Sequence, residues 1–139
     1  MEDVYECQAS ISGITSIQYD YNGKLFAVAT FDGEVFIIDM QTFATVGIFD
    51  LTPGPLTQIA WGYDLSSIFV GDGKGNIIKL DLDTKMTSII YSSPIPITSI
   101  ASCRTQFGVA AGLFNGQIFL VINSSLQTRK INAHDALIS

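Results

Sequence analysis

Residues 14–17 read Ile-Thr-Ser-Ile, and two later stretches repeat the pattern, with Leu-Thr-Gln-Ile at 56–59 and Ile-Thr-Ser-Ile at 97–100. The threonines of these three stretches are 42 and 41 positions apart. A fixed period of this length is typical of proteins built from repeated supersecondary units. The chain is therefore predicted to contain three consecutive copies of one structural unit.

A glycine occupies the equivalent position in each copy of the repeat. Gly33, Gly75 and Gly116 each precede a run of apolar residues, such as Val-Phe-Ile-Ile at 35–38. Asn-Gly and Asp-Gly pairs separate the apolar runs, and such pairs supply the positive φ angles that tight hairpin turns require. Each unit is thus predicted to hold four short antiparallel strands. In the first unit these are expected at 14–19, 25–30, 35–40 and 44–49.

The strand after each glycine is apolar at successive positions, so both faces of its sheet are expected to be covered. Four-stranded sheets that recur about every 40 residues and pack face to face are the blades of a β-propeller. The predicted fold class is therefore all-β, a partial β-propeller of three four-stranded antiparallel blades. A β-sandwich is the alternative, but it offers no reason for the period.

The predicted domain organisation is a single partial propeller. Its blades are expected at 11–52, 53–93 and 94–133, with a strand of a preceding blade at 1–10 and the start of a following blade at 134–139. Closed propellers contain about 4 to 8 blades, so three alone would expose apolar sheet faces. The remaining blades are expected from the rest of a longer chain, from a second copy that completes a six-bladed ring, or from a partner protein.

The units resemble the WD-repeat β-propeller family. The apolar-Thr-Ser-apolar start of the repeat is present, and Thr30, Asp32 and Gly33 match the family's Ser/Thr-x-Asp-Gly turn. Where the family's third strand ends in Trp-Asp, the first unit has Ile38 and Asp39. The resemblance implies a scaffold for protein–protein interaction within a larger protein or multi-protein complex.

Composition favours a protein partner. The net charge is −6, from 7 basic and 13 acidic residues, and the sequence holds no cluster of Lys and Arg. Binding to nucleic acid or to an anionic membrane surface depends on such clusters, so neither is expected. The acidic N-terminus does not resemble a signal peptide, and no run of 18 apolar residues is present. A cytoplasmic protein is predicted.

The sequence offers no catalytic constellation. His134 is the only histidine, and Cys7 and Cys103 stand alone, so neither a multi-histidine metal site nor a zinc site with paired cysteines can be assembled, and no histidine-based triad is predicted. The glycine-rich stretch at 71–76 lacks the spacing of a phosphate-binding loop and is predicted to be a hairpin turn. Asp81 and Asp83 are assigned to another turn. We therefore predict no enzyme activity, no catalytic residue, no cofactor and no metal.

An enzyme or a sugar-binding module that uses the central channel of the propeller is the alternative function. It would require acidic, histidine or arginine side chains on the innermost strands. The candidates at those positions are neutral, namely Thr15, Ser16, Gln58, Thr98 and Ser99.

Four residues are candidates for protein binding. Phe31, Leu113 and Phe114 are large apolar residues at hairpin turns, where exposure to solvent is expected. They are predicted to form a binding rim. Trp61 ends a first strand and is expected to pack between blades, with a role as a surface anchor for a partner as the alternative.

Overall fold

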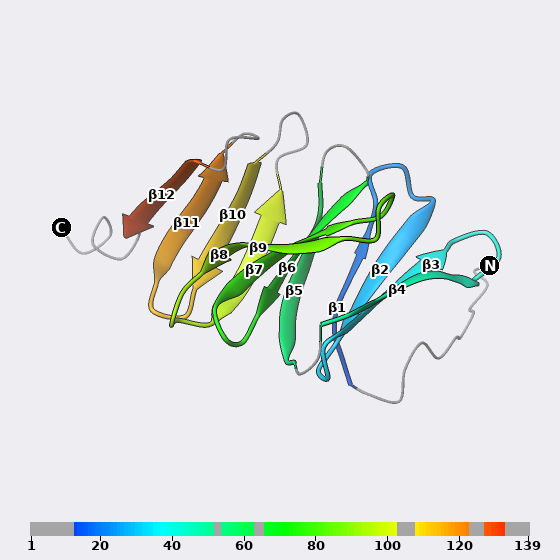
Figure 1. Ribbon diagram of the computed structural model, residues 1–139, viewed down its shortest axis with the longest axis horizontal. Helices are drawn as coiled ribbons and strands as arrows, with labels where there is room; N and C mark the ends of the chain where they lie inside the picture. Colours follow the sequence, from blue (N-terminus) through cyan, green and yellow to red (C-terminus); the bar gives the residue numbers. More distant parts are fainter. Residues whose placement is uncertain (1–12, 52–53, 63–65, 103–107, 123–126, 133–139) are drawn as a thin grey trace, which may run out of the picture.

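A computed structural model describes residues 13–51, 54–62, 66–102, 108–122 and 127–132 (Figure 1). All regular elements in these residues are β-strands. The strand predicted within 1–10 and the blade start predicted at 134–139 lie outside the described residues.

The described strands form three antiparallel sheets of four strands, which confirms the predicted fold class. Blade 1 contains β1 (Ile14–Tyr19), β2 (Leu25–Thr30), β3 (Glu34–Asp39) and β4 (Thr45–Asp50). Blade 2 contains β5 (Leu56–Trp61), β6 (Ser67–Asp72), β7 (Asn76–Asp81) and β8 (Thr87–Ser92). Blade 3 contains β9 (Ile97–Ser102), β10 (Gly108–Leu113), β11 (Gln117–Ile122) and β12 (Gln127–Asn132). The strands predicted for the first unit agree with the observed bounds to within one residue.

The repeated threonine marks the same irregularity in every blade. The pairing between the first two strands shifts register at Thr15, Thr57 and Thr98, so each threonine occupies a β-bulge of its inner strand. The Thr57 hydroxyl donates a hydrogen bond to the carbonyl of Ile97 in the next blade, at 2.7 Å. The residue that defines the sequence repeat is therefore also a contact between blades 2 and 3.

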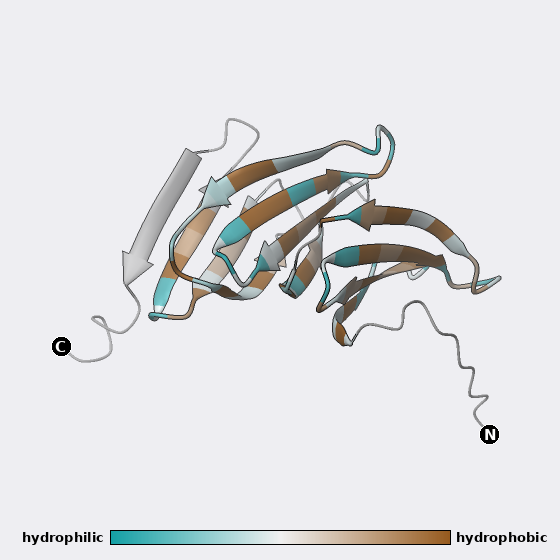
Figure 2. Ribbon diagram, turned by 60° about the horizontal axis from the view of Figure 1, so that its bottom comes forward, coloured by the Kyte–Doolittle hydropathy of each residue, from teal (hydrophilic) through white to brown (hydrophobic). Residues whose placement is uncertain are grey.

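Blade 2 is packed on both faces. One apolar cluster joins it to blade 1 and a second joins it to blade 3. Its second strand, β6, is buried along its whole length. Figure 2 shows hydrophobic residues along the strands and hydrophilic residues gathered at strand ends and turns. Burial of this apolar surface between blades is the main stabilising term of such a stack.

The outer faces of blades 1 and 3 have no further sheet against them in the described residues. On blade 1, Ile17, Tyr19 and Ile48 are 49%, 59% and 59% exposed and surround a small buried cluster. On blade 3, Ile118 and Leu120 are half-buried on the face that points away from blade 2. Both ends of the stack therefore present apolar side chains.

Candidate protein-binding rim

The turn between the second and third strands has the same attachment in each blade. Its first residue, which is Phe31, Gly73 or Phe114, donates a backbone hydrogen bond to the carbonyl of the residue before the inner strand. The distances are 2.7 Å to Gly13, 2.9 Å to Pro55 and 3.0 Å to Pro96. The three turns are thereby held beside the start of the inner strands, at one end of the blades. We call these three turns the rim.

A glycine with positive φ closes each turn of the rim. The φ angles of Gly33, Gly75 and Gly116 are 109°, 97° and 89°, which confirms the conformation predicted for the repeated glycines. The amide of Gly33 donates to the carbonyl of Thr30 at 3.2 Å, and the other two glycines make the equivalent hydrogen bond. At Gly75 a Cβ atom would overlap the carbonyl oxygen of Ser93. Only glycine fits this turn without rearrangement.

Polar side chains at the start of the rim turns accept hydrogen bonds that stabilise the turns. The Thr30 hydroxyl accepts a hydrogen bond from the amide of Glu34 at 3.0 Å. In blade 2, Asp72 Oδ1 accepts from the amides of Lys74 and Asn76 at 2.9 and 2.8 Å, and Oδ2 accepts from the Asn76 side chain at 2.9 Å. The glycine-rich stretch at 71–76 is therefore a hairpin turn, as predicted, and its acid has a structural role.

The three residues predicted to lie on the rim differ in their exposure to solvent. Phe31 and Phe114 occupy equivalent positions in blades 1 and 3 and are 60% and 77% exposed. The expected exposure of Leu113 is wrong, because its side chain is only 4% exposed. Leu113 is the last residue of β10, pairs with Ile97 and packs in the cluster between blades 2 and 3. Adjacent residues of a strand point to opposite sides, so Leu113 is buried beside an exposed Phe114.

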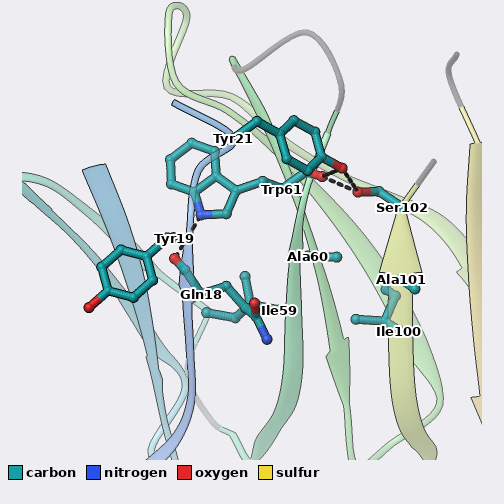
Figure 3. Close-up of a pocket in the computed structure, with 9 residues that line it drawn as sticks. All are labelled: Gln18, Tyr19, Tyr21, Ile59, Ala60, Trp61, Ile100, Ala101 and Ser102. Carbon is teal, nitrogen blue, oxygen red and sulfur yellow. Dashed lines mark hydrogen bonds between the residues drawn. The ribbon is translucent and has the colours of Figure 1, made fainter. Parts of the chain in front are cut away.

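Trp61 lies at the other end of the blades from the rim, because it is the last residue of an inner strand that starts there. Its side chain is 2% exposed and belongs to the cluster between blades 1 and 2. The indole Nε1 donates a hydrogen bond to the carbonyl of Gln18 at 2.9 Å (Figure 3). Trp61 thus packs between blades, as predicted, and presents no surface for a partner in this arrangement.

A pocket of about 310 Å³ adjoins Trp61 at this end of the inner strands (Figure 3). It is lined by three consecutive inner strands and by Tyr21 in the turn after β1. The hydroxyl of Tyr21 donates to the carbonyl of Trp61 at 3.2 Å and lies 2.8 Å from Ser102 Oγ. The polar groups of this pocket therefore join the blades to one another.

Two acids cap equivalent turns at the end of the blades opposite the rim. Asp39 Oδ1 accepts hydrogen bonds from the amides of Gln41 and Thr42 at 2.7 and 3.0 Å, and these bonds lower the pKa of Asp39 below its usual value. Asp81 Oδ1 accepts from Asp83 and Thr84 in the same way, and the Thr84 amide contributes most to lowering the pKa of Asp81. The predicted turn at 81–83 is confirmed.

Several exposed apolar residues were not identified from the sequence. They lie on or next to the outer strands β4 and β8, and they are Val46, Ile48, Met86 and Ile89. The available signal was the position of these strands as fourth in each unit, which makes them edge strands.

The described part of the chain contains no group of three or more His, Cys, Asp or Glu residues placed to hold a metal ion. Within the same residues, no helix has the length and hydrophobicity needed to cross a bilayer.

Comparison with known proteins points to one fold family. The family described as the anaphase-promoting complex subunit 4 WD40 domain matches residues 1–64. None of the curated proteins matches the chain by sequence.

Solved structures share this fold, and the descriptions of two of them name a β-propeller domain and WD40 repeats. The Cps50 (Swd1) β-propeller domain of Myceliophteria thermophila superposes with a TM-score of 0.73 at 17% identity, over 88% of this chain and 38% of that chain. U3-55K and the RRP9 WD40 repeats each superpose with a TM-score of 0.82 at 8% identity, over 89% of this chain and 40% of theirs. The chain thus spans about two fifths of the length of these structures.

Proposed function

The chain belongs by its fold to the WD-repeat β-propellers, and on that basis we propose that it is a non-catalytic scaffold for protein–protein interaction in the cytoplasm. Propellers of this kind are in general interaction platforms. Phe31 and Phe114 carry the proposal, because two large aromatic side chains project into solvent at equivalent turns on either side of Gly73. Aromatic residues, phenylalanine among them, are enriched at the cores of protein–protein interfaces.

The composition supports a protein as the partner. A net charge of −6 gives little basis for binding to phosphates of nucleic acid or lipid. The residues that cap the rim turns are held by hydrogen bonds within the turns, which leaves aromatic surface as the distinctive feature of the rim.

The experiment is partner capture with a rim variant. The proteins that co-purify with the wild-type chain are compared with those that co-purify with a Phe31→Ser/Phe114→Ser double variant. Loss of two such anchors is expected to weaken binding by about 2 kcal/mol, or roughly 30-fold, so the specific partners should be lost. A Met86→Ser variant, which alters a residue that is 67% exposed immediately before β8 and lies outside the rim, serves as the control. An unchanged partner set in the rim variant would refute this site.

We further propose that additional blades cover the outer faces of blades 1 and 3. The exposed Ile17, Tyr19 and Ile48 on blade 1 support this, since propeller sheets are normally covered on both faces. The three candidate sources are the rest of a longer chain, a second copy and a partner protein. Molar mass by light scattering separates them, because a dimer indicates a six-bladed ring, whereas a monomer that binds a dye for apolar surface requires blades from elsewhere.

A further inference from the structure

The turn between β1 and β2 carries an Asn-Gly pair. Asn22 and Gly23 lie at the end of blade 1 opposite the rim, and both are exposed to solvent. The Gly23 amide donates a hydrogen bond to the Asp20 carbonyl at 3.2 Å, which closes the turn. Gly23 has a φ of 72°, and nothing lies within 4 Å of its Cβ position. The pair therefore stands in open space that water can reach.

A second Asn-Gly pair occupies the same position in another turn. Asn115 and Gly116 lie between β10 and β11, and the Gly116 amide donates to the Leu113 carbonyl at 3.0 Å, three residues back, as in the first turn. Gly116 also has a positive φ, of 89°, and Asn115 is exposed. The two pairs thus share their sequence, their place in the turn and the exposure of the asparagine.

The two asparagines differ in what holds their side chains. Asn115 Oδ1 accepts a hydrogen bond from the Gln117 amide at 3.1 Å, and Asn115 Nδ2 donates to Gln117 Oε1 at 3.1 Å. Among the residues that the structure describes, none forms a hydrogen bond with the Asn22 side chain. The Asn22 carboxamide is therefore free to turn toward the main chain, whereas that of Asn115 is held away from it.

An asparagine that precedes glycine can react with its own main chain. The glycine nitrogen attacks Cγ of the asparagine, so a new N–C bond forms and the Cγ–Nδ2 bond breaks. The side-chain nitrogen leaves as ammonia and takes the amide proton with it, which gives a succinimide ring. Water then opens the ring at one of its two carbonyls and yields aspartate or isoaspartate. Glycine favours the attack because it has no side chain to block the approach, and asparagine is accordingly a heat-labile residue.

We propose that Asn22 is a site of deamidation and isoaspartate formation in the folded chain, and that its contacts with Gln117 protect Asn115. Both glycine amides are hydrogen-bonded within their turns, so those bonds do not distinguish the sites. The reaction requires only water and places a new carboxylate at position 22. It involves no residue of the Phe31 and Phe114 rim, so it goes beyond the proposed scaffold function and is tested independently of it.

The modification lies beside a contact that joins the blades. Tyr21 precedes Asn22, and its hydroxyl lies 2.8 Å from Ser102 Oγ and 3.2 Å from the Trp61 carbonyl oxygen. Isoaspartate adds a methylene group to the main chain of this turn, whereas aspartate leaves the main chain unchanged. We therefore expect isoaspartate at position 22 to displace the Tyr21 hydroxyl and to weaken the connection between blades.

The test incubates the full chain in mildly alkaline buffer and follows both asparagines by peptide mass spectrometry. Isoaspartate is identified by an enzyme that methylates only its carboxylate. In the folded chain Asn22 should convert at least about tenfold faster than Asn115, because two hydrogen bonds must break before Asn115 can reach Gly116. In denaturant the two sites should convert at equal rates, since the dipeptide is the same and the turns are lost.

Variants test the cause of the difference. Gln117→Ala removes the acceptor of Asn115 Nδ2 and should accelerate conversion of Asn115 without changing that of Asn22. The proposal is overturned if Asn22 converts no faster than Asn115 in the folded chain, if the difference persists in denaturant, or if Gln117→Ala leaves Asn115 unchanged. Circular dichroism establishes that each variant is folded.

The effect on the blades has its own controls. Wild-type chain that has formed isoaspartate should unfold at a lower urea concentration than fresh chain. Fresh Asn22→Asp, which adds the charge alone, should match fresh wild type, and Asn22→Gln should lose no stability during the same incubation. An incubated wild type that is as stable as the fresh chain would refute the proposed displacement of Tyr21.

Discussion

The hydroxyl oxygen of Tyr21 lies 2.8 Å from Ser102 Oγ, although the two residues are 81 positions apart and belong to blades 1 and 3. Between them lies the end of the inner strand of blade 2, whose Trp61 carbonyl is within hydrogen-bonding reach of both hydroxyls, so one hydroxyl can donate to the carbonyl while the other donates to its hydroxyl partner (Figure 3). One side chain from the turn after β1 therefore connects all three blades. Together with the hydrogen bonds that Thr57 and Trp61 make between blades, this network adds directional contacts to the apolar packing of the blades.

Removing the Tyr21 hydroxyl is predicted to loosen this connection. Tyr21→Phe should lower the free energy of unfolding by about 1 kcal/mol, the net value of a typical hydrogen bond. The measurement is urea denaturation followed by tryptophan fluorescence, since Trp61 is the only tryptophan. Tyr19→Phe is the control, because Tyr19 is 59% exposed on the outer face of blade 1.

The same network predicts non-additive effects. In a double-mutant cycle, Tyr21→Phe and Ser102→Ala should together cost less than the sum of their separate costs, because either change breaks the shared contact. Strict additivity, or an equal loss from Tyr19→Phe, would show that the hydroxyl pair does not couple the blades.

Acid should weaken the turns opposite the rim. The turn amides keep the pKa of Asp39 and Asp81 below the usual value of 3.8 in the folded chain. Unfolding restores the usual pKa, so the stabilising contribution of each carboxylate is present above that value and is lost as the pH falls through the lower folded-state pKa. An Asp39→Asn/Asp81→Asn variant should therefore lose less stability than wild type as the pH falls below 3.8.

Chemical denaturation across that pH range measures this difference. Each single variant should give part of the effect, and the two parts should add, because the two turns are in different blades. Parallel pH profiles for wild type and the double variant would contradict the assignment.

Alanine at the repeated glycine should cost more than alanine at an open turn. Gly23 has a φ of 72° with nothing within 4 Å of its Cβ position, so Gly23→Ala should cost about 1 to 2 kcal/mol from the backbone conformation. Gly75 has a φ of 97°, and a Cβ there would also overlap the Ser93 carbonyl oxygen, so Gly75→Ala should cost more. Denaturation midpoints compare the two variants. Equal losses would mean that the rim turn of blade 2 relaxes around a side chain.

The strands and their grouping could be predicted from the sequence because they depend on local signals. The repeated threonine and glycine mark a bulge and a turn that recur in all three blades, and both depend on short-range backbone geometry. The burial of Trp61 also followed from its place at the end of an inner strand.

The pocket beside Trp61 could not be predicted in the same way. It is lined by the inner strands of three blades, and the sequence does not report distances between strands of different blades. The burial of Leu113 was missed for a more local reason. A shift of one position decides whether a residue at a strand end points inward or belongs to the turn. Leu113 and Phe114 are both apolar, so hydrophobicity alone does not show which of them is buried.

This difference of one position yields a last prediction. Leu113→Ala should lower the free energy of unfolding by about 2 to 5 kcal/mol, because it removes a buried side chain from the cluster between blades 2 and 3 and leaves a cavity. Phe114→Ala should change it by no more than about 0.5 kcal/mol, because the ring is 77% exposed. Urea denaturation of both variants under identical conditions checks this. If Phe114→Ala were as destabilising as Leu113→Ala, Phe114 would belong to the core, and partner loss in a Phe114 variant would then report unfolding rather than a binding surface.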